Sequence, residues 1–203
     1  QPMRYAAVAD AFCAAFGERE RVRMFSAPGR SEISGNHTDH QHGRVLAAAV
    51  TLDVIAAASP RSDGAICICS AGYSPIRLHV DDLAPRKRER NTSIALVRGI
   101  AARLQQMGYR IGGLEAYVDS DVPKGSGLSS SAAYSILIAT IFSGLYNDGG
   151  IPAVDAALAS QYAENEYFGK PSGLMDQLAS ASGGFVAIDF ADPAHPVIER
   201  IDC

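Results

Sequence analysis

The stretch from residue 123 to residue 133 has the composition of an anion-binding loop. It reads Pro-Lys-Gly-Ser-Gly-Leu-Ser-Ser-Ser-Ala-Ala and runs into an apolar segment with helical spacing. Glycines let a backbone approach a ligand closely, and unpaired N–H groups at a helix N-terminus attract negative charge. The stretch has neither the Lys-Ser/Thr ending of a P-loop nor the spacing of a dinucleotide fingerprint. It is a phosphate-type loop or a simple connector, and the preceding Asp119 and Asp121 do not favour phosphate.

A second cluster of chemically active side chains lies between residues 29 and 43. These fifteen residues hold a single apolar side chain, together with Arg30 and three histidines. Amide, imidazole and carboxylate groups can bind neighbouring sugar hydroxyls, and a guanidinium can neutralise phosphate. The histidines could instead hold a metal ion, and the segment could be a plain surface loop.

A third cluster places two acidic residues on either side of a glycine-containing loop. Glu164 lies on a predicted helix that ends at Gly169, and Asp176 lies at the start of the next helix. One carboxylate could hold Mg²⁺ while the other faces a substrate hydroxyl. Alternatively, Glu164 is solvated and Asp176 only complements a helix dipole.

These clusters need a framework, and the hydrophobic pattern predicts one of mixed type. Helices are expected over residues 4–16, 94–107, 132–145, 152–168 and 173–181. Strands are expected over residues 21–27, 45–58, 65–70, 76–80, 114–119, 185–190 and 197–201, with helix an alternative for the alanine-rich 45–58. Strands and helices come in blocks rather than in strict alternation, so the fold class is α+β. No linker interrupts the chain, which indicates one domain.

The composition excludes several classes of function. The 203 residues are 47% hydrophobic with a net charge of -4, which does not suit bulk nucleic-acid binding. The basic run at residues 86–90 is expected to be a solvated loop. Cys67 and Cys69 point to one face of a predicted strand and are interpreted as free thiols of a reducing compartment, although a metal pair is an alternative. The chain has no membrane-length apolar run and no secretory leader, so a cytoplasmic location is expected.

In this order, the three clusters resemble the motifs of the GHMP small-molecule kinases, and within them of the galactokinases. Residues 29–43 resemble the galactokinase signature, residues 123–133 the family's phosphate loop, and residues 164–177 the segment that ends in Met-Asp-Gln. The resemblance covers essentially the whole chain. It implies the family's N-terminal α+β domain over residues 1–203, of the ribosomal protein S5 domain 2-like type, with a mixed β-sheet backed by helices.

The resemblance also implies roles in ATP-dependent phosphorylation of galactose at its anomeric hydroxyl. Asp176 would face that hydroxyl as a base or an electrostatic partner, and Arg30 would lie between Asp176 and the γ-phosphate. Ser131 and Glu164 would bind Mg²⁺. The residues that would hold the phosphates of ATP are Gly125, Ser126, Gly127, Leu128, Ser129, Ser130 and Ser131. The residues that would contact the sugar are Asn36, His37, Asp39 and Gly173.

Several positions depart from the family's pattern. Glu32 stands where the family usually has Asn, Asn36 where it has Glu, and His40 where it has Tyr. Ser93 and Leu96 occupy a neighbourhood in which the family often carries aromatic side chains that pack on adenine. The change to Asn36 leaves open a kinase for another sugar, such as an N-acetylhexosamine. A non-catalytic galactose-sensing regulator is a further alternative.

Length is a further departure, because the family has a second, C-terminal domain that completes the cleft. The chain starts at Gln1 and stops at Cys203, so we expect a fragment that lacks this domain. Such a fragment is expected to bind ATP weakly and to have little kinase activity. The expected partners are therefore the sugar, ATP and the missing domain, with no nucleic acid and no membrane.

Overall fold

The computed structural model describes residues 2–35, 42–192 and 195–201. In chain order the elements are α1 (Pro2–Phe16), β1 (Arg23–Ser34), β2 (Arg44–Arg61), β3 (Ala65–Ser70), β4 (Ile76–His79), the 3₁₀-helix η2 (Lys87–Glu89), α2 (Ser93–Gln106), β5 (Gly113–Ser120), α3 (Ser130–Tyr146), α4 (Ala153–Tyr162), the π-helix η3 (Ala163–Phe168), α5 (Met175–Ser182), β6 (Phe185–Asp189) and β7 (Val197–Ile201). The expected α+β class is confirmed.

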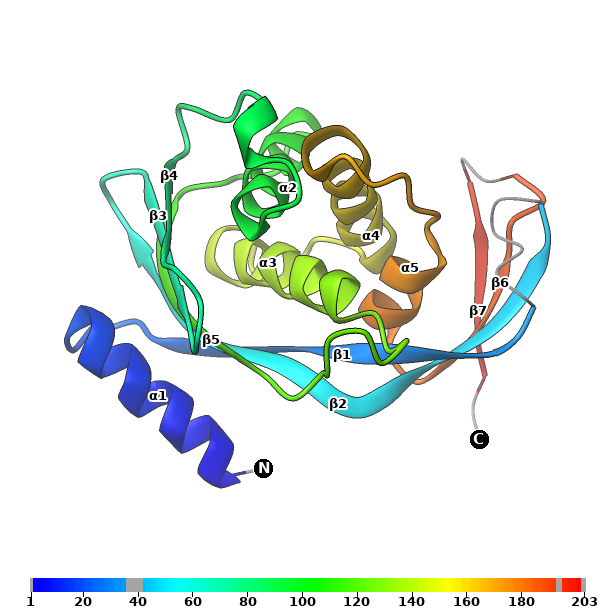
Figure 1. Cartoon of the computed structure of the whole chain (residues 1–203), viewed down its shortest axis with the longest axis horizontal. Helices are drawn as coiled ribbons and strands as arrows, with labels where there is room; N and C mark the ends of the chain where they lie inside the picture. The colour runs from blue at the N-terminus through cyan, green and yellow to red at the C-terminus, as the bar shows by residue number, and fades with distance from the viewer. Residues whose placement is uncertain (1, 36–41, 193–194, 202–203) are drawn as a thin grey trace.

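The strands form one mixed sheet with the order β4-β3-β5-β2-β6-β7, and β1 also pairs with β2. Among the strand pairs of the described residues, only β3–β5 is parallel. Residues 54–58 of β2 pair with both β1 and β5, and residues 46–48 pair with both β1 and β6. Since a strand has two edges, β1 lies along one edge of β2 while β5 and β6 share the other. The long strand β2 is therefore the spine of the sheet (Figure 1).

The second half of β2 is buried on both faces of the sheet. Val54, Ala56 and Ala58 belong to the main hydrophobic core, while Ile55 and Ala57 pack in a smaller cluster with α1. This two-sided burial explains the continuous apolar run, which is typical of strands that are covered on both faces. The strand prediction for residues 45–58 is confirmed, and the helix alternative is wrong.

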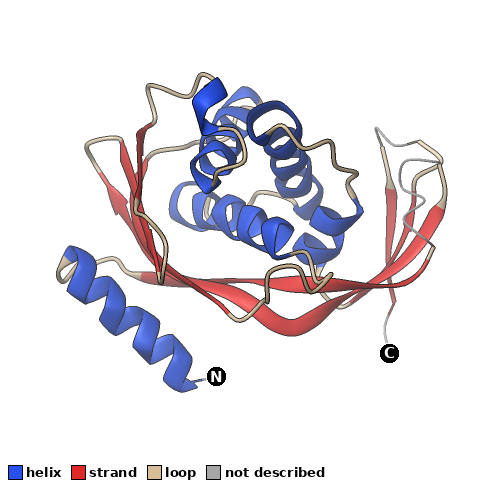
Figure 2. Cartoon of the chain, viewed as in Figure 1, coloured by secondary structure: helices blue, strands red, loops and turns tan. Residues whose placement is uncertain are grey.

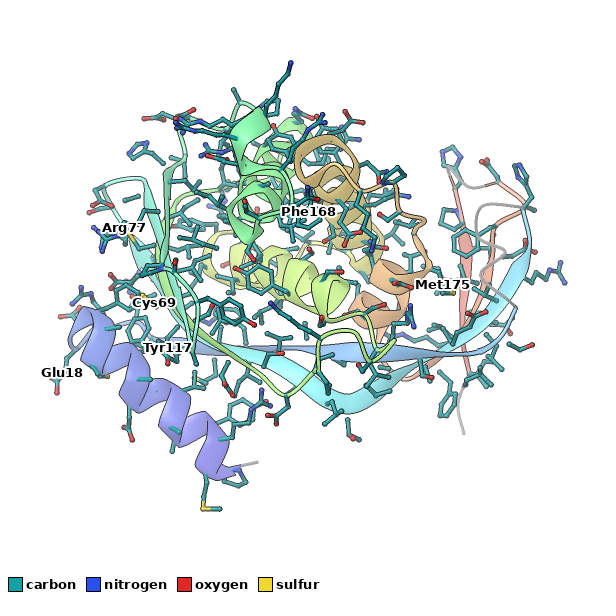
Figure 3. All side chains as sticks on the ribbon, viewed as in Figure 1. Glu18, Cys69, Arg77, Tyr117, Phe168 and Met175 are labelled. Atoms are coloured by element: carbon teal, nitrogen blue, oxygen red, sulfur yellow. The ribbon has the colours of Figure 1, made fainter. Side chains whose placement is uncertain are left out.

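Helices α2 to α5 lie together on one side of the curved sheet, and α1 lies on the opposite side (Figures 1 and 2). Phe12 of α1 is fully buried against β2 and β5, beside the partly buried Tyr117. Figure 3 shows Tyr117 and Cys69 on the part of the sheet nearest to α1. Among the described cysteines, Cys13, Cys67 and Cys69 are free thiols, as expected for the latter two.

The basic run at residues 86–90 is not wholly solvated, which corrects the sequence-based prediction. Its Glu89 is buried, and both of its carboxylate oxygens accept from Arg98 of α2, at 2.7 Å and 2.9 Å. A buried charge must be paired, so this ion pair ties η2 to the following helix. The pair thereby helps to place the N-terminus of α2.

Two further predictions were wrong in detail. The strand expected over residues 21–27 is longer, because β1 continues through Arg30 to Ser34 in a ladder with β2, so the start of the polar segment is not a loop. The helix expected over residues 152–168 is divided into α4 and the π-helix η3. Among the described residues, no helix is both long and apolar enough to cross a membrane.

Candidate active site

The glycine–serine loop, residues 123–129, connects β5 to α3. Gly125 and Gly127 have φ angles of 73° and 79°, and a Cβ at either would meet no neighbouring atom. Glycine is therefore needed there for its backbone conformation and not for space. Ser129 is also left-handed, with φ of 54°, and directly precedes α3. The loop thus delivers its backbone to a helix N-terminus, which is the arrangement expected of an anion site.

Strand β1 supports this loop at an irregularity in its ladder with β2. The register shifts between Pro28 and Arg30, and a Cβ on the intervening Gly29 would lie 2.9 Å from the Leu128 carbonyl oxygen. The Arg30 backbone N–H donates to the same oxygen at 3.1 Å, and Arg30 Nη1 donates to the Gly127 carbonyl at 2.8 Å. A glycine at position 29 lets the loop rest directly on the strand.

Asp176, in the first turn of α5, joins the strand to the loop. Arg30 Nε donates to Asp176 Oδ1 at 2.7 Å, and Ser129 Oγ donates to Asp176 Oδ2 at 2.5 Å. The Arg30 side chain is only 8% exposed, whereas that of Asp176 is 33% exposed. Ser180 Oγ of the same helix donates to the Pro28 carbonyl at 2.7 Å, which holds α5 against β1. A carboxylate that solvent can reach is thus oriented by a buried guanidinium.

Glu164 lies on the π-helix and is almost fully buried. Its Oε1 atom has no hydrogen-bond partner. Burial raises the pKa of the Glu164 carboxyl most, and the nearby Asp176 raises it further. The hydroxyls of Ser172 and Ser131 and the Lys170 ammonium act in the opposite direction. The predicted pair Ser131 and Glu164 therefore lies together, close to Asp176.

A cavity of about 1010 Å³ opens beside the glycine–serine loop. Its walls include the turn after β3, the end of β5, the loop at Lys124, the first turn of α3 and the N-terminus of α2. Ser93 and Leu96, the two positions that depart from the family's aromatic pattern, both line it. Lys124 and Tyr73 both line the cavity, and Lys124 Nζ lies 4.2 Å from the centre of the Tyr73 ring.

Of the four residues predicted to contact the sugar, the structure describes only Gly173. Gly173 lies in the segment between η3 and α5, three residues before Asp176. Asn36, His37 and Asp39 lie outside the described residues, as does His40. Figure 3 labels Phe168, at the end of η3, and Met175, which directly precedes Asp176.

Two residues of the cavity, Tyr73 and Tyr134, were not predicted from the sequence to lie at the site. The Tyr134 hydroxyl is buried without a hydrogen-bond partner, and burial raises the pKa of this phenol. Tyr134 follows the loop by one helical turn, so its position was the available signal. Nothing local to Tyr73 marks it, because its place in the cavity depends on the pairing of β3 with β5.

Two family models match different parts of the chain. Residues 10–60 match the galactokinase galactose-binding signature, and residues 95–184 match the N-terminal domain of GHMP kinases. The two matches contain Arg30, the loop, Glu164 and Asp176 between them. Residues 95–184 thus carry the N-terminal domain of GHMP kinases. The fold of the chain is that of a GHMP kinase N-terminal domain.

The chain is also similar to galactokinases over most of its length. It is 39% identical over 160 residues to a galactokinase of Streptomyces coelicolor, covering 78% of the chain and 41% of the relative. It is 31% identical over 173 residues to a galactokinase of Clostridium tetani, covering 85% and 43% respectively. The chain thus spans less than half the length of these curated relatives.

Solved structures agree on the fold. The structure of Lactococcus lactis galactokinase complexed with galactose superposes with a TM-score of 0.87 at 26% identity, over 98% of this chain and 52% of that one. Methanococcus jannaschii mevalonate kinase gives a TM-score of 0.72 at 16% identity, over 92% and 57%. At 16% identity the likeness to the mevalonate kinase shows the fold alone. The structure at 26% identity is that of a galactokinase.

Proposed function

We propose that this chain forms the sugar- and phosphate-binding part of an ATP-dependent sugar 1-kinase, with galactose as the acceptor. The observation that carries the proposal is the Arg30–Asp176–Ser129 network. It joins a carboxylate within reach of solvent to a loop built for phosphates. The galactokinase relatives and the galactose complex support the choice of sugar.

Asp176 and Arg30 take the catalytic roles in this proposal. In the transfer, the anomeric oxygen bonds to the γ-phosphorus, the bond from that phosphorus to the bridging oxygen of ADP breaks, and the hydroxyl proton leaves. Asp176 accepts that proton or stabilises the charge that develops as it departs. Arg30 orients Asp176 and lies beside the loop, where a guanidinium can stabilise charge on the transferred group.

The nucleotide is proposed to bind along the glycine–serine loop and in the adjoining cavity. Backbone N–H groups of residues 125–131 would hold its phosphates, as at other helix N-termini. The cavity reaches the N-terminus of α2, where Ser93 and Leu96 provide a small, largely aliphatic wall in place of aromatic rings. The base is therefore expected to lie in this cavity.

Mg²⁺ fits the residues beside the loop. Glu164 offers a buried oxygen without a partner, and the Ser131 hydroxyl lies nearby. Among the described residues, no group of three or more His, Cys, Asp or Glu side chains could hold a metal ion. Mg²⁺ does not need such a group, because it binds through one or two carboxylates, water and the substrate's phosphates. When bound, it would neutralise charge on the phosphates.

The sugar contacts and the location remain those expected from the sequence. Asn36, His37, Asp39 and Gly173 are proposed to contact the sugar. Free thiols at Cys67 and Cys69 support a reducing compartment, and hence the cytoplasm. Because the chain spans less than half of its relatives, we expect the 203 residues alone to bind ATP weakly and to turn over little sugar.

The test is an ADP-release assay on the natural full-length protein that contains this chain, with galactose and N-acetylgalactosamine among the sugars. Galactose should be phosphorylated, and Asp176→Asn should lower kcat by about 10²- to 10⁴-fold, the usual range for a lost acid–base group. Asp155→Asn is the matched control. Asp155 also lies in the first turn of a helix, where it accepts from the Tyr109 hydroxyl, and its loss should leave turnover unchanged.

Other outcomes would contradict the proposal in distinct ways. Turnover of N-acetylgalactosamine in preference to galactose would support the other sugar kinase and assign the difference to Asn36. Binding of galactose and ATP without turnover would support the sensor. Full activity in Asp176→Asn would show that the network is not catalytic.

A further inference from the structure

Three carboxylates surround the point at which the chain leaves the sheet for the glycine–serine loop. Asp53 lies within β2, Asp119 near the end of β5, and Asp121 directly after that strand. Asp119 also lines the cavity beside the loop. Three negative charges next to a phosphate site oppose the binding of an anion, unless a cation offsets them.

Arg4 of α1 contacts all three carboxylates. Helix α1 lies on the side of the sheet opposite to helices α2 to α5 (Figure 1). Arg4 Nε donates to Asp119 Oδ2 at 2.9 Å, and its Nη1 pairs with Asp53 Oδ1 and lies 3.1 Å from Asp121 Oδ2. Its Nη2 donates to the backbone carbonyls of Asp53 at 3.0 Å and Asp119 at 3.2 Å. One guanidinium thus holds side chains and main chain of two adjacent strands.

Asp53, which Arg4 contacts, is also hydrogen-bonded to the start of the loop and to strand β1. The Asp121 backbone N–H donates to the Asp53 carbonyl at 3.0 Å, which fixes the start of the loop on β2. The Asp53 carboxylate also accepts from Ser26 Oγ at 2.6 Å. Ser26 lies on β1, the strand on which Arg30 and the loop meet. Arg4 therefore contacts the strand that enters the loop and, through Asp53, the strand beneath it.

We propose that Arg4 is a positioning residue for nucleotide binding, which holds the entry to the glycine–serine loop and offsets the carboxylates that would repel phosphates. The inference rests on the proposed function, because it takes the loop to bind nucleotide phosphates. It explains how Asp119 and Asp121 can stand directly before such a loop. It also gives the N-terminal helix, on the far side of the sheet, a part in the site.

The test compares Arg4→Met with Arg19→Met in the natural full-length protein. Arg19 is a matched control, because it also pairs the N-terminal segment with a buried carboxylate of β5, Glu115. Glu115 lies at the opposite end of β5 from the loop. Both variants should lose stability, so stability alone does not distinguish them. The readouts are MgADP affinity by titration calorimetry and amide hydrogen exchange in residues 121–129.

Arg4→Met should bind MgADP about tenfold more weakly, as expected for the loss of one nearby positive charge. It should also exchange amides faster across residues 121–129. Arg19→Met should show neither change. The inference is overturned if Arg4→Met matches the parent in both readouts, or if Arg19→Met matches Arg4→Met.

A second variant keeps the test decisive if Arg4→Met does not fold. Arg4→Lys retains a charge but not the planar fork of donors, so exchange should rise while affinity falls less. Unchanged exchange in Arg4→Lys would overturn the positioning role. A parent protein that binds no MgADP would contradict the proposed function instead, and the exchange comparison would then decide the role of Arg4 alone.

Discussion

At the residue scale, Glu164 is an acid in surroundings that disfavour its charge. Burial raises its pKa, and one of its oxygens has no hydrogen-bond partner. Between the ordinary glutamate pKa and the raised one, the folded chain holds a proton that the unfolded chain has released. The unfolded state then binds fewer protons, so stability falls as pH rises through this window. Without a bound cation, the ionised Glu164 therefore destabilises the fold.

The Glu164→Gln variant should not lose stability in this pH window, because its amide stays neutral. In the absence of divalent cations, its free energy of unfolding relative to the parent should increase as pH rises from about 4 to about 8, by about 1.4 kcal/mol for each unit by which the pKa is raised. Urea unfolding at several pH values measures this. Glu166→Gln, on the same π-helix but exposed, should run parallel to the parent. Parallel curves for Glu164→Gln would refute the destabilisation.

The residues of the site differ in how far the sequence could predict them. Arg30, Ser129 and Asp176 are far apart in the chain but lie in motifs whose composition marks each one, and the structure brings them together. Arg4 could not be predicted. It lies on an alanine-rich helix with no local signal, and its importance depends on carboxylates that only the folded sheet places nearby.

At the element scale, the π-helix η3 depends on close packing against α2. Gly99 of α2 faces it, and a Cβ there would lie 2.7 Å from the Ala163 Cβ and 2.9 Å from the Tyr167 Cγ. Such contacts are shorter than real side chains adopt. A glycine in α2 therefore allows the approach that places Glu164, which follows Ala163 directly.

Gly99→Ala should consequently destabilise the chain, by about 1–3 kcal/mol for an overpacked core. In an open helix the same change would stabilise by up to about 1 kcal/mol, so the sign itself is informative. Urea unfolding of the single variants and of Gly99→Ala with Ala163→Gly forms a double-mutant cycle. The cost of the alanine should be smaller in the glycine background. Equal costs in both backgrounds would show that the two positions do not interact.

Element types were predictable where a single periodicity governs a segment, as in the strand β2 and the helix α3. They were not predictable where tertiary contacts override composition. The polar residues after Gly29 look like a loop, yet their backbone completes a ladder with β2, and the charge of Arg30 is paired with Asp176. The π-helix likewise has no local sequence signal, because packing against α2 selects it.

At the scale of the whole molecule, one main hydrophobic cluster includes residues of β1 to β3, β5, β6 and α2 to α5. The smaller cluster beneath α1 shares strand β2 with it. Elements that share a core unfold together, so the chain should unfold in a single transition. In a calorimetric scan, the calorimetric enthalpy should equal the van't Hoff enthalpy. A separate early transition would show that α1 melts independently of the sheet.

The position of β6 on the spine strand has a consequence for biosynthesis. On one edge of β2, residues 44–48 pair with residues 185–189, which a ribosome makes about 140 residues later. The hairpin of β1 and β2 can close early, but on the other edge of β2 residues 44–48 stay unpaired until residues 185–189 have been made. An open apolar edge can pair with neighbouring chains. The nascent protein should therefore depend on chaperones until β6 emerges from the exit tunnel.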